Sequence, residues 1–252
     1  MGNLESGMGT RGGLVGLGGA GASAPDHSPF PIPHSRRLRL AVLASGRGSN
    51  LQAILDAIAI GALNATLVGV FSDRSRAAAL QRARDAGAHA QALSPRGFDS
   101  RAKFDLALFD AVDAVAPDLI VCAGYMRLID AAVAAARSGR IINIHPSLLP
   151  AFKGLHTHRQ ALAAGVAEHG ASVHFVTADL DGGPVIAQAR VPVLAGDDED
   201  ALAARVLARE HPLLVATLQL FADGDVMLRE DSVHIRDERA APLQLSSNNA
   251  FA

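Results

Sequence analysis

The chain contains few of several residue types, and each scarcity limits what the protein can be. Its 252 residues include no tryptophan, one tyrosine and one cysteine, Cys122. A single cysteine excludes an intrachain disulfide and a cysteine-rich zinc site, and it fits a reducing compartment. The formal net charge of −2 offers no electrostatic attraction to nucleic acid or to an anionic membrane. Since no apolar run reaches the length of about 18 residues that a membrane span requires, we expect neither nucleic acid nor membrane as a partner.

Apolar residues are abundant instead. They make up 49% of the chain against 19% charged residues, a balance typical of a protein with a substantial core. The N-terminal segment is an exception, because glycine and alanine dominate it up to Ala24 and four prolines follow by Pro33. Such a composition cannot bury a core. We therefore expect residues 1–36 to be a disordered arm and residues 37–252 to form the folded domain.

Beyond Leu38 the apolar pattern alternates between strand-like and helix-like. Buried strands are expected at 38–44, 67–72, 118–123, 141–145, 172–177 and 185–193. Helices are expected at 51–61, 77–86, 101–115, 129–138, 158–164 and 198–222, with a kink or break at Pro212. This alternation predicts a single Rossmann-like α/β domain, with a mostly parallel twisted sheet flanked by helices.

A glycine-containing turn joins the first strand to the first helix. Gly46 and Gly48 allow the backbone to approach an anion, and the free N–H groups at a helix start favour phosphate. A dinucleotide site is an alternative, because Asp73 ends the second strand where a ribose-binding acid would lie. However, Leu51 occupies the third glycine position of that fingerprint. The loop therefore suits a monophosphate better than a dinucleotide.

A second polar pattern ends the strand at 141–145. Asn143 and His145 alternate with Ile144, so a strand would direct both polar side chains to one face. Pro146 stops the strand, and Leu149-Pro150 requires another constrained turn. An amide and an imidazole side by side could act on a carbonyl group, although such a pair is more often structural when it occurs alone.

Three motifs together resemble one family. They are Ser45-Gly46-Arg47-Gly48-Ser49-Asn50-Leu51-Gln52, Asn143-Ile144-His145-Pro146-Ser147-Leu148-Leu149-Pro150 and Leu180-Asp181-Gly182-Gly183-Pro184. The second and third resemble the signatures of the folate-dependent formyltransferases. The first narrows the resemblance to the members that formylate phosphoribosylglycinamide. The resemblance covers about residues 38 to 230, in the same order and spacing.

The resemblance implies a reaction and its catalytic residues. Asn143, His145 and Asp181 would transfer the formyl group of 10-formyltetrahydrofolate directly to the amine of glycinamide ribonucleotide, through a tetrahedral intermediate. The carboxylate would lie beside the imidazole and orient it. No metal and no covalent enzyme intermediate are implied. The step belongs to de novo purine biosynthesis, which implies a cytoplasmic protein acting as a monomer or weak homodimer.

Binding residues follow from the same resemblance. The ribonucleotide and its phosphate would be held by Gly48, Ser49, Asn50 and Glu210. The folate would be held by Arg101, Met126, Arg127, Leu128, Ile129 and Asn143, with the loop at 177–181 forming part of the pterin pocket. The turn at Leu149-Pro150 implies a cis peptide bond. Leu207 and Pro212 depart from the family pattern at the expected rim of the substrate site.

Four alternatives compete with this interpretation. A formyltetrahydrofolate deformylase would carry an N-terminal regulatory domain, and a methionyl-tRNA formyltransferase would carry a C-terminal barrel and a basic surface. A non-catalytic nucleotide-binding Rossmann-like protein would have no use for the three catalytic residues together. A metallohydrolase could use the histidines and carboxylates at His156, His158, His169, His174, Asp179 and Asp181, but no His-Glu-x-x-His pattern accompanies them.

Overall fold

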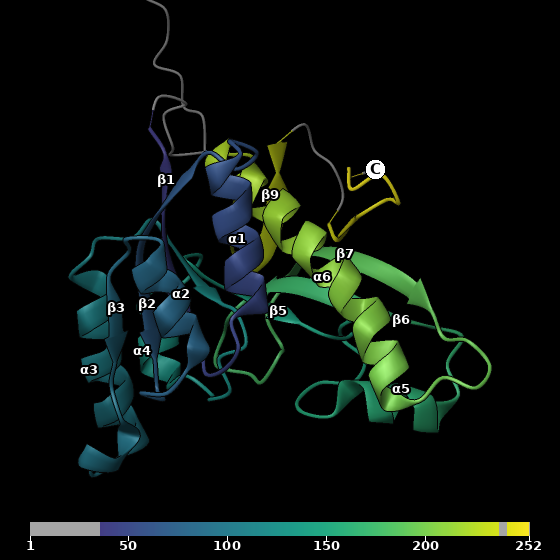
Figure 1. Ribbon diagram of the computed structural model, residues 1–252, viewed down its shortest axis with the longest axis horizontal. Coiled ribbons are helices and arrows are strands. Elements are labelled where there is room, and N and C mark those ends of the chain that lie inside the picture. Colours follow the sequence, from purple (N-terminus) through teal and green to yellow (C-terminus); the bar gives the residue numbers. More distant parts are fainter. Residues whose placement is uncertain (1–35, 237–240, 252) are drawn as a thin grey trace, which may run out of the picture.

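The computed structural model describes residues 36–236 and 241–251, so the arm expected at 1–36 lies outside the described residues apart from Arg36. One sheet organises the fold, with eight strands in the order β10-β7-β6-β5-β4-β1-β2-β3 (Figure 1). Helices cover both of its faces, so the predicted α/β architecture is confirmed. Within the described ranges, no helix has the length and apolar character needed to cross a membrane.

The first half of the sheet is parallel. Its strands are β1 (Leu38–Leu43), β2 (Ala65–Ser72), β3 (Ala90–Ala92), β4 (Leu119–Cys122) and β5 (Ile141–His145). The helices that connect them are α1 (Ser49–Ala59), α2 (Ala78–Asp85), α3 (Arg101–Asp113) and α4 (Ala131–Ala135), with a short 3₁₀ turn, η1 (Pro95–Gly97). Alternate residues of β1 enter two separate cores, because Leu40 and Val42 pack toward α1 while Ala41 and Leu43 pack toward α3.

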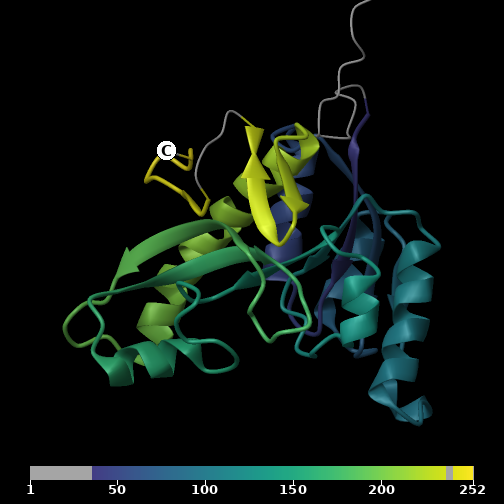
Figure 2. The ribbon, with the colours of Figure 1, turned by 180° about the vertical axis from the view of Figure 1, so that it is seen from behind.

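The second half of the sheet is antiparallel around β6. Its strands are β6 (Glu168–Phe175) and β7 (Val185–Pro192), with β10 (Leu243–Gln244) beside β7 at the edge. Helix α5 (Thr157–Ala164) follows β5, and the long α6 (Glu199–Ala222) packs against β6, β7 and α1 (Figures 1 and 2). A hairpin of β8 (Val226–Arg229) and β9 (Ser232–Ile235) comes after α6. This half brings β6 antiparallel to β5, the strand that ends in His145.

Several expectations about elements were wrong in detail. Strands β3 and β10 were not expected, since both are very short; β6 begins at Glu168 instead of residue 172; and α4 is only five residues long. Helix α6 continues through Pro212, so the break expected there does not occur. Proline inside a helix costs about 3 kcal/mol, whereas each buried leucine contributes about 1.5–3 kcal/mol. The buried Leu213, Leu214 and Leu218 therefore outweigh the proline and keep the helix in place.

Candidate active site

A cavity of about 670 Å³ opens at the C-terminal ends of the parallel strands. Its walls come from five segments far apart in the sequence, namely 47–50, 122–129, 143–146, 154–158 and 176–181, together with Glu199, Leu207 and Glu210 of α6. In open parallel sheets, ligands bind at this edge because the strand ends and helix starts converge there. The cavity therefore collects most of the predicted site residues in one place.

His145 ends β5 with its ring almost fully buried. Its Nδ1 lies 3.5 Å from Oδ2 of Asp181, and its Nε2 lies 3.1 Å from the carbonyl oxygen of Phe152. A carbonyl oxygen can only accept, so Nε2 donates to it. Asp181 also accepts the N–H of Gly154 at 2.9 Å, in a turn where its own φ is +44°. The predicted pairing of Asp181 with His145 is confirmed, across 36 residues of sequence.

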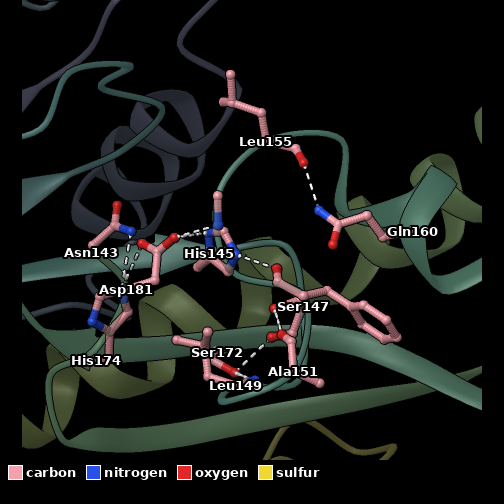
Figure 3. Close-up of polar contacts among 12 residues, drawn as sticks. Asn143, His145, Ser147, Leu149, Ala151, Leu155, Gln160, Ser172, His174 and Asp181 are labelled. Carbon is pink, nitrogen blue, oxygen red and sulfur yellow. Dashed lines mark hydrogen bonds and ion pairs between the residues drawn. The ribbon is translucent and has the colours of Figure 1, made fainter. Parts of the chain in front are cut away.

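Asn143 is held by a residue that the sequence reasoning did not assign to the reaction centre. Its Nδ2 lies 3.1 Å from Nε2 of His174, because antiparallel pairing places His174 directly opposite Asn143 (Figure 3). The other ring nitrogen of His174, Nδ1, lies 2.8 Å from the carbonyl oxygen of Phe175 and donates to it. Burial lowers the pKa of His174, which favours the neutral ring whose Nε2 accepts from the Asn143 amide.

The Asn143 amide has two N–H groups and lines the cavity. One N–H is directed to His174, and within residues 36–236 and 241–251 the other has no assigned hydrogen-bond partner. His174 Nε2 also lies 3.7 Å from Oδ1 of Asp181, so the same carboxylate contacts both imidazoles (Figure 3). Sequence reasoning had grouped His174 only with a possible metal cluster. The sequence shows that His174 and Ser172 share one face of β6. It does not show the register between β6 and β5, which places His174 opposite Asn143.

The glycine loop presents the start of α1 to the cavity. Gly48 precedes the helix in a left-handed conformation, φ +74°, and no side chain caps the helix start. The first N–H groups of α1 are therefore open to an anion. Arg47, Ser49 and Asn50 line the cavity, whereas Gly48 packs against Ala79. Arg47 adds a positive charge that was not assigned from the sequence.

Glu210 approaches the same loop from α6. It is buried, and one of its carboxylate oxygens accepts a hydrogen bond from Nδ2 of Asn50 at 3.3 Å. Burial raises the pKa of Glu210, while the bond from Asn50 opposes that shift. Leu207 lies one helical turn earlier and lines the cavity too. The contact between α1 and α6 thus places a carboxylate beside the expected phosphate loop.

Most of the residues expected to bind folate lie at the cavity, but Arg101 does not. Met126, Arg127, Leu128 and Ile129 all line the cavity, and the side chains of Met126 and Leu128 are 59% and 40% exposed. Arg101, at the start of α3, is not among the lining residues. Its charge lowers the pKa of Asp105, one helical turn later, against the effect of burial. The structure therefore does not bring Arg101 together with the other predicted residues.

The turn after His145 is tightly hydrogen-bonded. Leu149-Pro150 is cis, as predicted. Ser172 of β6 organises the turn, since its Oγ accepts the N–H of Leu149 and donates to the carbonyl oxygen of Ser147 at 2.7 Å (Figure 3). Gln188 of β7 donates to the carbonyl oxygen of Leu149 at 2.9 Å. Side chains of the neighbouring strands β6 and β7 thus hold the turn that follows His145.

Two further histidines, His158 and His169, stack against each other behind the reaction centre. His169 is fully buried, and its ring stacks edge-to-face with Phe152 and His158 at centroid distances of 5.8 and 5.3 Å. Burial and the nearby rings of His158 and His145 lower the pKa of His169 to about 4. Across residues 36–236 and 241–251, no group of three or more histidine, cysteine or acidic side chains is arranged to hold a metal ion.

The geometry agrees with similarities to known proteins. A family model described as formyl transferase matches residues 38–218. Phosphoribosylglycinamide formyltransferase of Escherichia coli is 48% identical over 205 residues, which cover 81% of this chain and 97% of that protein. Among solved structures, glycinamide ribonucleotide transformylase 1 from Symbiobacterium toebii aligns with a TM-score of 0.78 and 47% identity, covering 82% of this chain and 96% of that one. Formyltetrahydrofolate deformylase from Burkholderia mallei shares the fold at a TM-score of 0.72 but with only 28% identity, covering 81% of this chain and 72% of that one.

Proposed function

The chain belongs to the formyl transferase family, and from this premise we propose that Asn143, His145 and Asp181 carry its formyl transfer. The protein is a one-carbon group transferase of purine biosynthesis that formylates phosphoribosylglycinamide with a formyl-folate cosubstrate. In our proposal the cosubstrate is 10-formyltetrahydrofolate, no metal takes part, and the reaction occurs in the cytoplasm by a monomer or weak homodimer. The observation that carries the catalytic assignment is the convergence of three polar side chains on one cavity wall.

The chemistry needs charge stabilisation and one proton transfer. The glycinamide amine attacks the formyl carbon, and the carbonyl oxygen gains negative charge in a tetrahedral intermediate. The N–H of Asn143 that does not contact His174 would donate to this oxygen. The C–N10 bond then breaks, the amine loses a proton, and N10 of the folate gains one. His145 and Asp181 would act as a pair to carry that proton between the two nitrogens.

Binding is assigned by charge and shape. The N–H groups of Ser49 and Asn50 at the α1 start, together with the Arg47 side chain, would hold the ribonucleotide phosphate. Gly48 would serve the same loop through its left-handed backbone. Glu210 would face the glycinamide end of the substrate, since it lies on the same side of the cavity as Asn50. The segment 126–129 would contact the folate with its exposed apolar side chains.

A deformylase is the second candidate, because it would use the same residues with water as the nucleophile. The structural likeness to the Burkholderia mallei deformylase favours this candidate. The phosphate loop and Glu210 argue against it, since water as nucleophile needs neither. The two reactions can be distinguished because only the formyl transfer requires the ribonucleotide for tetrahydrofolate to form.

The test is a steady-state assay of the purified full chain with 10-formyltetrahydrofolate, with and without glycinamide ribonucleotide. We expect tetrahydrofolate to form only with the ribonucleotide present, in equal amounts with formylated ribonucleotide. Formate release without ribonucleotide would identify a deformylase. Dialysis against a chelator should leave the rate unchanged. A loss of activity after this treatment would overturn the metal-free mechanism.

A further inference from the structure

The segment 126–129 is held at both ends by buried side chains outside the catalytic trio. At its start, the N–H of Met126 donates to Oγ of Ser45 at 3.0 Å. At its end, the N–H of Asp130 donates to Oδ2 of Asp105 at 2.8 Å. Ser45 is 2% exposed and Asp105 is fully buried, so water does not compete for either bond. Two acceptors from different segments, the turn after β1 and helix α3, thus fix one loop of the cavity.

The first anchor has a support of its own. Ser45 donates its hydroxyl hydrogen to Oδ1 of Asp73 at 2.6 Å, which leaves its oxygen lone pairs to accept from Met126. The backbone N–H of Ser45 donates to the carbonyl oxygen of Gly124 at 3.0 Å. Asp73 is the acid that could have bound a ribose in a dinucleotide fold. Here it is buried at the end of β2 and orients Ser45 instead.

The second anchor is an unusual place for a carboxylate. Asp105 lies on the buried face of α3 among Phe104, Leu108 and Phe109, and its Oδ1 has no hydrogen-bond partner in the described part of the chain. Burial raises the pKa of Asp105, while the N–H of Asp130 and the charge of Arg127 oppose that shift. Burying a carboxyl group is unfavourable unless hydrogen bonds or charges compensate for the lost hydration. Among residues 36–236 and 241–251, the one hydrogen bond that Asp105 accepts is the bond from Asp130 that ends the loop.

We propose that Ser45, oriented by Asp73, and Asp105 are positioning residues that clamp the loop 126–129 against the folate cosubstrate. The inference rests on the proposed assignment of this loop to folate. None of the three touches the reacting atoms, so they act through the loop backbone. Two of the loop's apolar side chains, Met126 and Leu128, are exposed at the cavity. A ligand that contacts them binds a loop already ordered by the two anchors, and so loses less conformational entropy on binding.

The clamp predicts where kinetic effects appear. Removing an anchor loosens the folate loop without altering His145 or Asn143, so the Michaelis constant for the folate should rise while turnover changes little. Ser45→Ala and Asp105→Leu should each raise that constant about three- to tenfold, the size of one lost hydrogen bond. The constant for the ribonucleotide should change less in Asp105→Leu, because Asp105 bonds to the far end of segment 126–129, whereas Ser45 directly precedes the glycine loop.

Conservative variants separate the clamp from general destabilisation. Asp105→Asn and Asp73→Asn both keep an oxygen that accepts the same bond, so they should retain a folate constant within about twofold of the parent. Matched controls come from the same elements. Ser72→Ala removes a buried hydroxyl that accepts a hydrogen bond from the N–H of Arg74. Asp113→Ala removes a carboxylate of α3 that pairs with Arg137. Both controls should lower the thermal midpoint without changing the folate constant.

The experiment measures steady-state constants for both substrates, the thermal midpoint, and equilibrium binding of 10-formyltetrahydrofolate to each variant. A rise in the folate constant and dissociation constant that is specific to Ser45→Ala and Asp105→Leu, and absent in the asparagine variants, would support the clamp. The clamp is overturned if the controls raise the folate constant equally, or if turnover falls instead. If the parent protein does not bind the folate at all, the proposed function fails, which is a separate outcome from unaltered binding in the variants.

Discussion

The reaction centre at the end of β5 and the folate loop after β4 line the same cavity but are held in different ways. His145 and His174 are 6% and 2% exposed, and each has both ring nitrogens directed to a protein atom. Met126 and Leu155 at the rim are 59% and 66% exposed. His145 and His174 are held rigidly because they lie on the paired strands β5 and β6. Met126 and Leu155 lie on loops that a bound ligand can cover.

The largest effect should come from breaking the centre at Asp181. Asp181→Asn keeps the shape of the side chain but loses the charge beside His145, so turnover should fall by about 10²–10⁴-fold, as for lost acid–base assistance. Both Michaelis constants should stay near the parental values, because Asp181 does not belong to the rim. If affinity collapses while turnover is preserved, Asp181 is a binding residue and the contrast between the two regions is wrong.

The buried strands should also make the fold sensitive to acid through His169. Its folded pKa is lowered to about 4 from 6.5, so between these values the unfolded state binds a proton that the folded state does not. Stability should therefore fall as the pH drops through this window, by up to about 3 kcal/mol. His169→Phe, whose ring has the same edge-to-face neighbours, should flatten this dependence in urea melts. A parallel decline in both proteins would locate the acid sensitivity elsewhere.

The phosphate loop offers a test on the recognition side. Arg47→Ala removes a charge from the cavity wall and should raise the Michaelis constant for the ribonucleotide about tenfold, the size of a charge-assisted hydrogen bond, with the folate constant unaffected. Gly48→Val was the obvious variant, but a Cβ there would lie 2.8 Å from that of Ala79. Its effect would mix folding with binding. Equal weakening of both substrates by Arg47→Ala would contradict the assignment.

His174 tests whether a residue behind the centre acts on catalysis alone. His174→Leu removes the acceptor of the Asn143 amide, so the oxyanion donor loses its orientation and turnover should fall about tenfold. His234→Leu, in the exposed β8–β9 hairpin, is the matched control and should leave turnover unchanged. Equal turnover in both variants would show that Asn143 does not depend on His174.

The smallest effect should come from the N-terminal arm. A chain starting at Arg36 keeps the ion pair of that residue with Asp118, at 2.6 Å, and all residues of both regions. Its thermal midpoint and activity should equal those of the full chain. A large loss of either would show that the glycine- and proline-rich arm contributes to the domain.

Local patterns were enough to predict the strands that lead into the site. Apolar runs marked β1, β4 and β5, and the alternation of Asn143 with His145 placed both on one face, because side-chain direction along a strand depends only on neighbours. Helix ends were less certain, and α6 passes through Pro212 because packing outweighs local preference. The role of Asp181 came from the resemblance to a family, not from its neighbours in sequence.

Contacts between distant segments depended on the tertiary structure. The antiparallel register of β6 against β5 places His174 opposite Asn143, and no property of either segment alone specifies that pairing. The same holds for Ser45, which bonds to Asp73 and Met126, and for Asp105, which bonds to Asp130. Sequence by itself determined the elements and the chemistry available on them. The tertiary structure decided which polar groups share a buried site, because each must find its hydrogen-bond partner wherever the packed elements bring one.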